Sequence, residues 1–240
     1  MRRWRASHPG TLGLVPTMGY LHEGHLDLVR QAREENRHVV VSIFVNPLQF
    51  GKNEDYALYP RTLDADVEKL RGAGADALFC PSDREVYPNG VEEQTTVAVP
   101  TMTNILCGAT RAGHFTGVTT IVRKLFNIVQ PHKAVFGIKD FQQLAVVKRM
   151  VEDLCFPIEI IEAPVARAED GLALSSRNGY LNAHERAIAP ALHRALVQTR
   201  EAIAAGERNY ALLEARAHIS LLEAGMRPDY FSVRAAKTLE

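Results

Sequence analysis

Two kinds of hydrophobic pattern alternate along the first two-thirds of the chain. Short, mostly apolar runs at residues 11–15, 38–45, 77–80, 134–136 and 158–161 predict strands. Between them, apolar residues recur every three or four positions over residues 24–35, 63–71, 114–129 and 141–154, which predicts helices. Strands that alternate with helices in this way are typical of an α/β fold, a parallel sheet flanked by helices. A further short strand is predicted at residues 97–99.

The pattern changes after Pro164. An Ala-rich helix is predicted over residues 183–206, a second helix over 210–224 and a strand over 230–233. We therefore place a boundary near residue 165, between a domain of residues 1–164 and a smaller α+β domain of residues 165–240. The chain ends at Glu240 before any strand that could pair with residues 230–233, so we expect the smaller domain to be incomplete.

The charge balance excludes some partners. Lys plus Arg and Asp plus Glu both number 28, so the formal net charge is zero and gives no electrostatic case for nucleic acid or an anionic membrane. The three cysteines are far apart and form no C-x-x-C pair, which favours a reducing compartment. The sequence has neither a secretory signal nor an apolar run long enough to span a membrane, and a cytoplasmic location is predicted.

Ligands of parallel α/β folds bind beyond the carboxyl ends of the strands. The loop after the first strand contains His22 and His25, three residues apart at the start of a helix. A helix start offers free N–H groups and a positive dipole end to a phosphate, and the imidazoles can add hydrogen bonds. Gly24 lets a nucleotide approach the backbone closely. The alternatives are a pair of structural histidines or a zinc site, for which the H-E-x-x-H spacing is absent.

Three more segments follow predicted strands. Asn46 and Gln49 offer neutral amides that could bind a small polar substrate, although the segment taken alone favours a plain Asn-Pro turn. Residues 137–143 supply Lys139 for a phosphate, with Asp140 at the helix start; alone, this pair is typical of a solvated helix end. Residues 174–178 place two hydroxyls and Arg177 where they could hold a triphosphate, but a Ser-Ser-Arg sequence alone is not specific.

Taken together, these motifs are specific. The first loop resembles the H-x-G-H signature of the nucleotidylyltransferase superfamily, and residues 174–178 resemble its K-M-S-K-S loop. PTMGYLHEGH, FVNPLQF, YPRTLDAD, RAGHFTGV, GIKDFQQL and LALSSRNGYL, in this order, resemble the pantothenate synthetase (pantoate–β-alanine ligase) family over nearly the whole chain. The resemblance implies a Rossmann-like domain with a small lid domain, ATP and Mg²⁺ as co-substrate and metal, pantoate and β-alanine as substrates, and a homodimer.

The resemblance also assigns residues. It implies that ATP is bound by Met18, Gly19, Tyr20, Leu21, His22, Glu23, Gly24, His25, Gly137, Ile138, Lys139, Asp140, Ala166, Leu174, Ser175, Ser176 and Arg177. Within this set it implies a catalytic, charge-stabilising group of His22, His25, Lys139, Ser175, Ser176 and Arg177. Gln49, with Asn46, is assigned to bind pantoate and then β-alanine, and Gln143 is assigned to bind pantoate. Arg111 and His114 are assigned as a basic pair near the pantoate pocket. Asp66 is implied as the metal-ligating carboxylate, with Asp64 nearby.

The implied reaction is the ATP-dependent condensation of pantoate with β-alanine through pantoyl adenylate, which releases pyrophosphate and AMP. The chain departs from the family pattern at Ile138, where a polar residue is usual. Two alternatives stay open at this point. The chain could be another nucleotidylyltransferase, or a non-catalytic ATP-binding module if the short lid abolishes activity.

Overall fold

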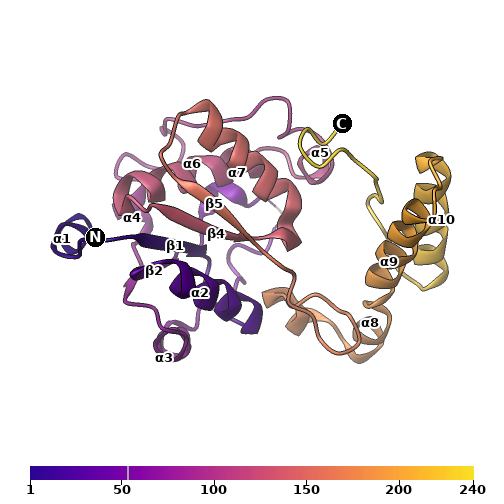
Figure 1. Cartoon of the computed structure of the whole chain (residues 1–240), viewed down its shortest axis with the longest axis horizontal. Helices are drawn as coiled ribbons and strands as arrows, with labels where there is room; N and C mark the ends of the chain where they lie inside the picture. The colour runs from indigo at the N-terminus through magenta and orange to yellow at the C-terminus, as the bar shows by residue number, and fades with distance from the viewer. Residues whose placement is uncertain (53) are drawn as a thin grey trace. The chain divides into compact units, whose positions relative to one another are not determined.

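The computed structural model describes residues 1–52 and 54–240, which form two compact units, Met1–Pro164 and Val165–Glu240 (Figure 1). The first unit contains a five-stranded sheet in the order β3-β2-β1-β4-β5, and every neighbouring pair is parallel. The strands are β1 (Leu12–Thr17), β2 (His38–Ile43), β3 (Ala77–Phe79), β4 (Lys133–Gly137) and β5 (Glu159–Ala163). The parallel α/β fold predicted from the hydrophobic pattern is confirmed.

Helices cover both faces of this sheet. The elements of the unit are α1 (Arg2–Ser7), α2 (Glu23–Glu35), α3 (Leu63–Ala73), α4 (Asp83–Val86), α5 (Cys107–Thr110), α6 (His114–Val129) and α7 (Phe141–Asp153), with 3-10 turns η1 (Pro47–Gln49) and η2 (Ile138–Asp140). Helices α2 and α3 lie on one face, and α6 and α7 lie on the other (Figure 1). None of the helices in the described part of the chain is long and apolar enough to cross a membrane.

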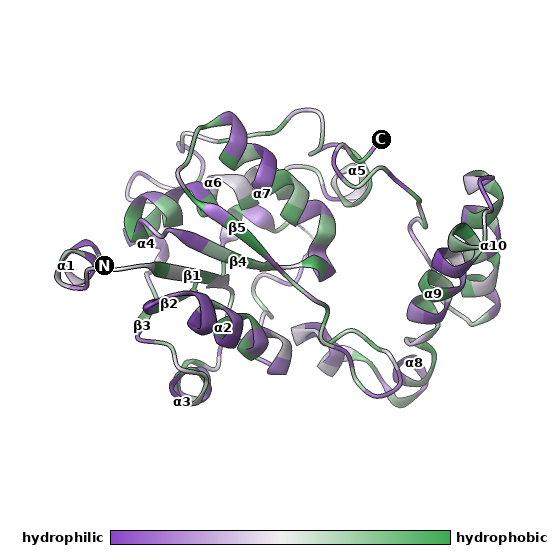
Figure 2. Ribbon diagram, viewed as in Figure 1, coloured by the Kyte–Doolittle hydropathy of each residue, from purple (hydrophilic) through white to green (hydrophobic). Residues whose placement is uncertain are grey.

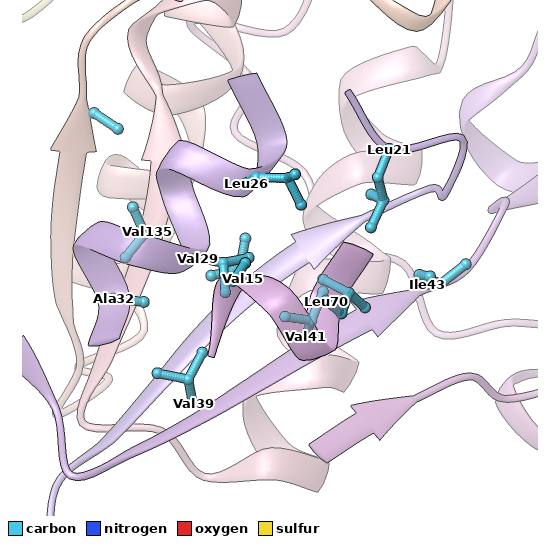
Figure 3. Close-up of a cluster of buried hydrophobic side chains, with 12 residues drawn as sticks. Val15, Leu21, Leu26, Val29, Ala32, Val39, Val41, Ile43, Leu70 and Val135 are labelled. Atoms are coloured by element: carbon cyan, nitrogen blue, oxygen red, sulfur yellow. The ribbon is translucent and has the colours of Figure 1, made fainter. Parts of the chain in front are cut away.

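The core explains why the strands are apolar throughout. On the α2 face, strand residues such as Val15, Val41 and Val135 pack against Val29 of α2 and Leu70 of α3 (Figure 3). Their sequence neighbours point to the opposite face and are equally buried, because side chains alternate along a strand. The helices are amphipathic, with hydrophobic and hydrophilic residues on different sides (Figure 2).

The predicted strand at residues 97–99 is wrong. Side chains of α6 take up its backbone groups: the Val97 N–H donates to Thr120 Oγ1 at 3.0 Å, and the Val97 carbonyl accepts from the Thr119 hydroxyl. The Val99 carbonyl accepts from Met102 and Thr103, which makes a turn. The residue types in this segment favour an extended backbone, but its hydrogen bonds go to a helix and a turn rather than to a neighbouring strand.

The strand order reverses at β1. The chain runs from β1 outward to β2 and β3, and then returns to place β4 and β5 on the other side of β1. Such a switch point separates the loops that follow the two central strands and leaves a crevice between them for a ligand. The loop after β1 leads into α2, and the loop after β4 contains η2 and leads into α7. Both segments singled out from the sequence, around His22 and around Lys139, therefore lie at this switch point.

The second unit is mainly helical. Its elements are η3 (Ser176–Tyr180), α8 (Ala183–Ile188), α9 (Ala191–Ala204) and α10 (Tyr210–Glu223), and Arg167 and Ala173 form an isolated antiparallel bridge. The single helix predicted over 183–206 is divided near Pro190, which has no N–H to continue α8. The strand predicted over 230–233 is also wrong. No described strand pairs with it, and the Val233 N–H donates to the Glu214 carboxylate at 2.7 Å instead.

Candidate active site

The loop after β1 is held in place by a carboxylate from α3. The backbone N–H groups of Tyr20 and Leu21 donate to the two oxygens of Asp66 at 2.9 and 2.8 Å. Gly19 adopts a φ of +81°, and a Cβ there would lie 3.2 Å from one of those oxygens. The glycine is therefore needed both for the left-handed turn and for the close approach of the loop to Asp66.

Two histidines stand at the start of α2, directly after this loop. His22 is the N-cap residue and His25 lies in the first turn, and their ring centroids are 4.0 Å apart. The His22 N–H donates to Nδ1 of His25 at 3.3 Å. A neutral ring that accepts at Nδ1 carries its proton on Nε2, so His25 is left with one hydrogen-bond donor for a ligand. Nδ1 of His22 is buried and has no hydrogen-bond partner among the described residues.

Burial keeps both histidines neutral. It lowers the pKa of His25 to about 3, with His22, Lys139 and Lys69 adding smaller contributions in the same direction. The pKa of His22 is also lowered, first by burial and then by the charges of Lys139 and Lys69. At neutral pH the pair therefore donates hydrogen bonds without carrying charge. The positive charge of this site comes from the lysines.

The two lysines come from different elements. Lys139 lies in η2 after β4, and its Nζ is 3.2 Å from the Asp140 carboxylate. Lys69 comes from α3 and donates from Nζ to the Leu21 carbonyl at 2.6 Å. Sequence reasoning missed Lys69. Its position three residues after Asp66, on the same side of α3, was the signal that could have found it.

The side-chain amides predicted to bind substrate differ in how many of their hydrogen-bonding groups are already used within the protein. Asn46 is 1% exposed: its Oδ1 accepts from the Tyr87 hydroxyl and the Leu48 N–H, and its Nδ2 donates to the Gly117 carbonyl and to Oε1 of Gln49. These four bonds use the full capacity of the amide. Asn46 thus holds Gln49 rather than facing a ligand. The other end of the Gln49 amide, Nε2, lies 3.1 Å from Sδ of Met18.

Two adjacent glutamines at the start of α7 have different surroundings. Gln142 is buried and bonds to the 102–107 segment: its Oε1 accepts from the Cys107 N–H at 3.0 Å, and its Nε2 donates to the carbonyls of Met102 and Ile105. Gln143 is half-buried, and its amide makes no hydrogen bond to any described residue. Gln143 therefore has an amide available for a ligand, whereas Gln142 fixes a neighbouring loop.

In the second unit, a short hairpin leads into the Ser-Ser-Arg segment. The Leu174 N–H donates to the Ala166 carbonyl at 2.9 Å, so these two predicted ATP-binding residues lie opposite each other. Ser175 is the N-cap residue of η3, and its hydroxyl accepts from the Arg177 N–H at 3.3 Å. Ser176 is buried. The hairpin gives this segment a defined backbone within its own unit.

The chain is similar over its whole length to one family of ligases. The sequence model described as "Pantoate-beta-alanine ligase" matches residues 1–240. The chain belongs to the pantoate–β-alanine ligase family. The family resemblance inferred from the motifs is confirmed.

Individual relatives agree with this. A protein of Saccharophagus degradans named pantothenate synthetase is 58% identical over 230 residues, which are 96% of this chain and 81% of that protein. A crystal structure of pantothenate synthetase from Thermus thermophilus superposes with a TM-score of 0.90 at 49% identity and covers 100% of this chain and 87% of its own. A Francisella tularensis pantoate-beta-alanine ligase, described as complexed with beta-gamma ATP and beta-alanine, gives a TM-score of 0.77 at 36% identity, over 91% of this chain and 82% of its own.

The carboxylates assigned to a metal do not fit a metal site. Asp66 is 1% exposed, and each of its oxygens accepts a backbone N–H. Asp64 lies on the exposed side of α3. Over the described residues, no group of three or more His, Cys, Asp and Glu side chains could hold a metal ion. In this member of the pantoate–β-alanine ligase family, Asp66 is a loop-holding carboxylate.

This assignment predicts the effect of Asp66→Asn. The amide replaces one acceptor with a donor that faces a loop N–H, so we expect the free energy of unfolding to fall by about 2–4 kcal/mol. Urea denaturation in the presence of EDTA measures this loss without any divalent cation. The matched control is Asp64→Asn, an exposed position on the same helix, which should change stability by less than about 0.5 kcal/mol. Wild-type stability of Asp66→Asn in EDTA would contradict the loop-holding role.

Proposed function

We propose that this chain catalyses the ATP-dependent condensation of pantoate with β-alanine to pantothenate, with release of pyrophosphate and AMP. The observation that carries the proposal is the neutral histidine pair at the start of α2, at the switch point of the sheet, with the charges of Lys139 and Lys69 close enough to lower the pKa of both rings. Such a site offers hydrogen bonds and positive charge to a polyphosphate. Membership of the pantoate–β-alanine ligase family supports the choice of substrates.

The first step forms an acyl adenylate. A carboxylate oxygen of pantoate attacks the α-phosphorus of ATP, and the bond from that phosphorus to the bridging oxygen of pyrophosphate breaks. No enzyme nucleophile is needed, so the protein positions the reactants and stabilises charge. His22 and His25 serve as neutral donors to phosphate oxygens, and Lys139 serves as the mobile positive charge, exchanging its Asp140 partner for phosphate.

The second step forms the amide. The amine of β-alanine, as its free base, attacks the acyl carbon of pantoyl adenylate, the bond from that carbon to the phosphate oxygen breaks, and AMP leaves with the electron pair. The proton lost by the nitrogen passes to solvent. Gln49 and Gln143 are proposed to hold pantoate through their amides, with Gln49 also binding β-alanine. The half-buried, unpaired amide of Gln143 supports its part of this assignment.

The proposal divides the work between the two units. Residues 1–164 bind ATP and pantoate. Within them, Met18–His25 and Gly137–Asp140 bind ATP. Residues 165–240 act as a lid, with Ala166 on the adenine side and Leu174, Ser175, Ser176 and Arg177 gripping the triphosphate. Magnesium enters as the counter-ion of the ATP phosphates, since Mg²⁺ commonly keeps its waters and binds through substrate phosphates. A homodimer and a cytoplasmic location complete the proposal.

A coupled assay tests the proposed function. The chain is incubated with ATP, Mg²⁺, pantoate and β-alanine, and AMP and pantothenate are measured together with pantoate-dependent exchange of pyrophosphate into ATP. AMP formation that requires both substrates supports the proposal. Nucleotide binding without AMP would identify a non-catalytic ATP-binding module. Pyrophosphate release triggered by a different acceptor, and not by pantoate, would identify another nucleotidylyltransferase.

A further inference from the structure

A chain of polar contacts leads from Glu54 to the backbone of Gln49. Arg111 donates from Nε and Nη2 to the two carboxylate oxygens of Glu54 at 2.7 and 2.6 Å. Both side chains are partly buried, about a third and a quarter exposed. This bidentate geometry fixes the plane of the Arg111 guanidinium, and the carboxylate of Glu54 balances its charge. Arg111, predicted to lie near the pantoate pocket as a basic residue, is therefore already paired with a carboxylate.

His114 forms the next link. Its Nε2 is 3.0 Å from Nη1 of Arg111, and its Nδ1 is 2.7 Å from the Gln49 carbonyl. Arginine can only donate, so Nε2 must accept and the ring proton must lie on Nδ1, which donates to Gln49. Burial lowers the pKa of His114, and the charge of Arg111 lowers it further. Together these effects outweigh the hydrogen bond to Gln49 and the charge of Glu54, which raise the pKa. The ring is thus a neutral connector with both nitrogens engaged.

The turn that carries Gln49 is held by a second set of contacts. The turn η1 packs directly on α6, where a Cβ at Gly117 would lie 2.3 Å from the Leu48 carbonyl oxygen. The Gly117 carbonyl in turn accepts from Nδ2 of Asn46 at 3.1 Å. Contacts from Gly117 and from the Arg111–His114 pair therefore meet at the backbone of Leu48 and Gln49. The side chain of Gln49 projects from a backbone that cannot easily shift.

We propose that Glu54, Arg111 and His114 are positioning residues that fix Gln49 for the acid substrate, rather than residues that contact the substrate themselves. The proposal rests on the proposed function, in which Gln49 binds pantoate. It assigns a role to Glu54, for which the sequence offered no signal. It also predicts a particular kinetic signature, because a misplaced Gln49 weakens the interaction with pantoate and leaves the ATP site around α2 unaffected.

The first measurement compares three variants by steady-state kinetics with pantoate or ATP varied. We expect His114→Ala to raise the KM for pantoate by about tenfold, with the KM for ATP changed less than twofold, because a displacement well below 1 Å suffices for such a loss. His114→Asn places an amide N–H near the former Nδ1 and should recover most of the affinity. Arg33→Gln, which breaks a comparably exposed pair with Asp76, is the matched control and should leave both constants unchanged.

A double-mutant cycle separates positioning from direct contact. If His114 acts only through Gln49, then His114→Ala should cost less than about twofold in kcat/KM for pantoate when Gln49 is already alanine, because the two effects are not additive. An equal loss in both backgrounds would overturn the proposal and indicate that His114 contacts the substrate. Glu54→Gln, which does not touch Gln49, should show the same pantoate-specific and non-additive loss in weaker form.

The outcomes distinguish this inference from the proposed function. Absence of pantoate-dependent exchange in the wild-type chain would overturn the function itself. Wild-type exchange with an unchanged KM for pantoate in both Glu54→Gln and His114→Ala would overturn only the positioning role. Glu54→Gln is conservative in shape and acts on Gln49 only through Arg111, so its kinetics still test the proposal if His114→Ala fails to fold.

Discussion

Replacement of His25 by alanine is expected to lower the rate of pantoate-dependent ATP–pyrophosphate exchange by about 10²–10³-fold, the usual cost of removing one preorganised donor from a developing negative charge. Nδ1 of His25 accepts from the His22 N–H, so the proton on Nε2 is the one presented to a ligand. Alanine removes that donor and leaves the His22 N–H without its acceptor. His25→Gln is the informative partner variant, since its amide N–H lies near the former Nε2 and should retain more activity than alanine.

The same residue predicts the pH profile. The pKa of His25 is lowered from its ordinary value of 6.5 to about 3, so the neutral, donating form persists as the pH falls through 6 and 5. We therefore expect no acid limb near pH 6.5 that belongs to His25, and a loss of its donor function only near pH 3–4. An acid limb near pH 6.5 that disappears in His25→Gln would contradict this. Exchange by His25→Ala within threefold of wild type would contradict the donor role itself.

Replacement of Lys139 by alanine is expected to reduce kcat/KM for ATP in the exchange reaction by about 10²–10³-fold, because a lysine charge beside phosphates stabilises the transition state more than the ground state. In the structure its ammonium group is 3.2 Å from Asp140 and partly exposed, so it can turn to a ligand. Lys139→Arg preserves the charge but not its compact shape and should fall between wild type and alanine.

Lys148→Ala provides the control for this prediction. Lys148 lies on α7, next to η2, and is also partly exposed and paired with a carboxylate, that of Glu162. Surface pairs of this kind contribute little to stability. We therefore expect exchange close to wild type for Lys148→Ala. Equal losses in the two variants would indicate a general effect of lysine removal, and near wild-type exchange in Lys139→Ala would remove Lys139 from the site.

The sequence predicted the position of the site better than its internal contacts. His22, His25 and Lys139 could be found because each follows a strand, and the carboxyl ends of parallel strands meet at one edge. The partners of Asp66 could not, because they lie 45 and 46 positions earlier in the chain. Nothing local shows that a carboxylate in a helix turns toward a distant loop, and the same short motif is compatible with a metal ligand.

Other errors have the same origin. Residues 97–99 and 230–233 have the composition of strands, but a strand forms only where another strand offers hydrogen bonds, and that depends on the tertiary structure. The pairing of Glu54 with Arg111 spans 57 residues and leaves no periodic pattern. Gln142 and Gln143 are neighbours of the same type, and only the packing of α7 decides which one is buried and which keeps an open amide.

The way in which the turn η1 is held has a consequence for how substrate selectivity could change. His114 and Arg111 both approach the carbonyl of Gln49, and Gly117, further along α6, packs against the carbonyl of Leu48. These anchors bind main-chain atoms that every amino acid possesses, so they do not depend on the side chain at position 49. A new side chain at this position would therefore start from the same backbone position, although it would lose the contact of the Gln49 amide with Asn46. If Gln49 binds the acid as proposed, position 49 is therefore a suitable first position to vary in experiments that aim to change acid specificity, because the contacts that hold its backbone stay intact.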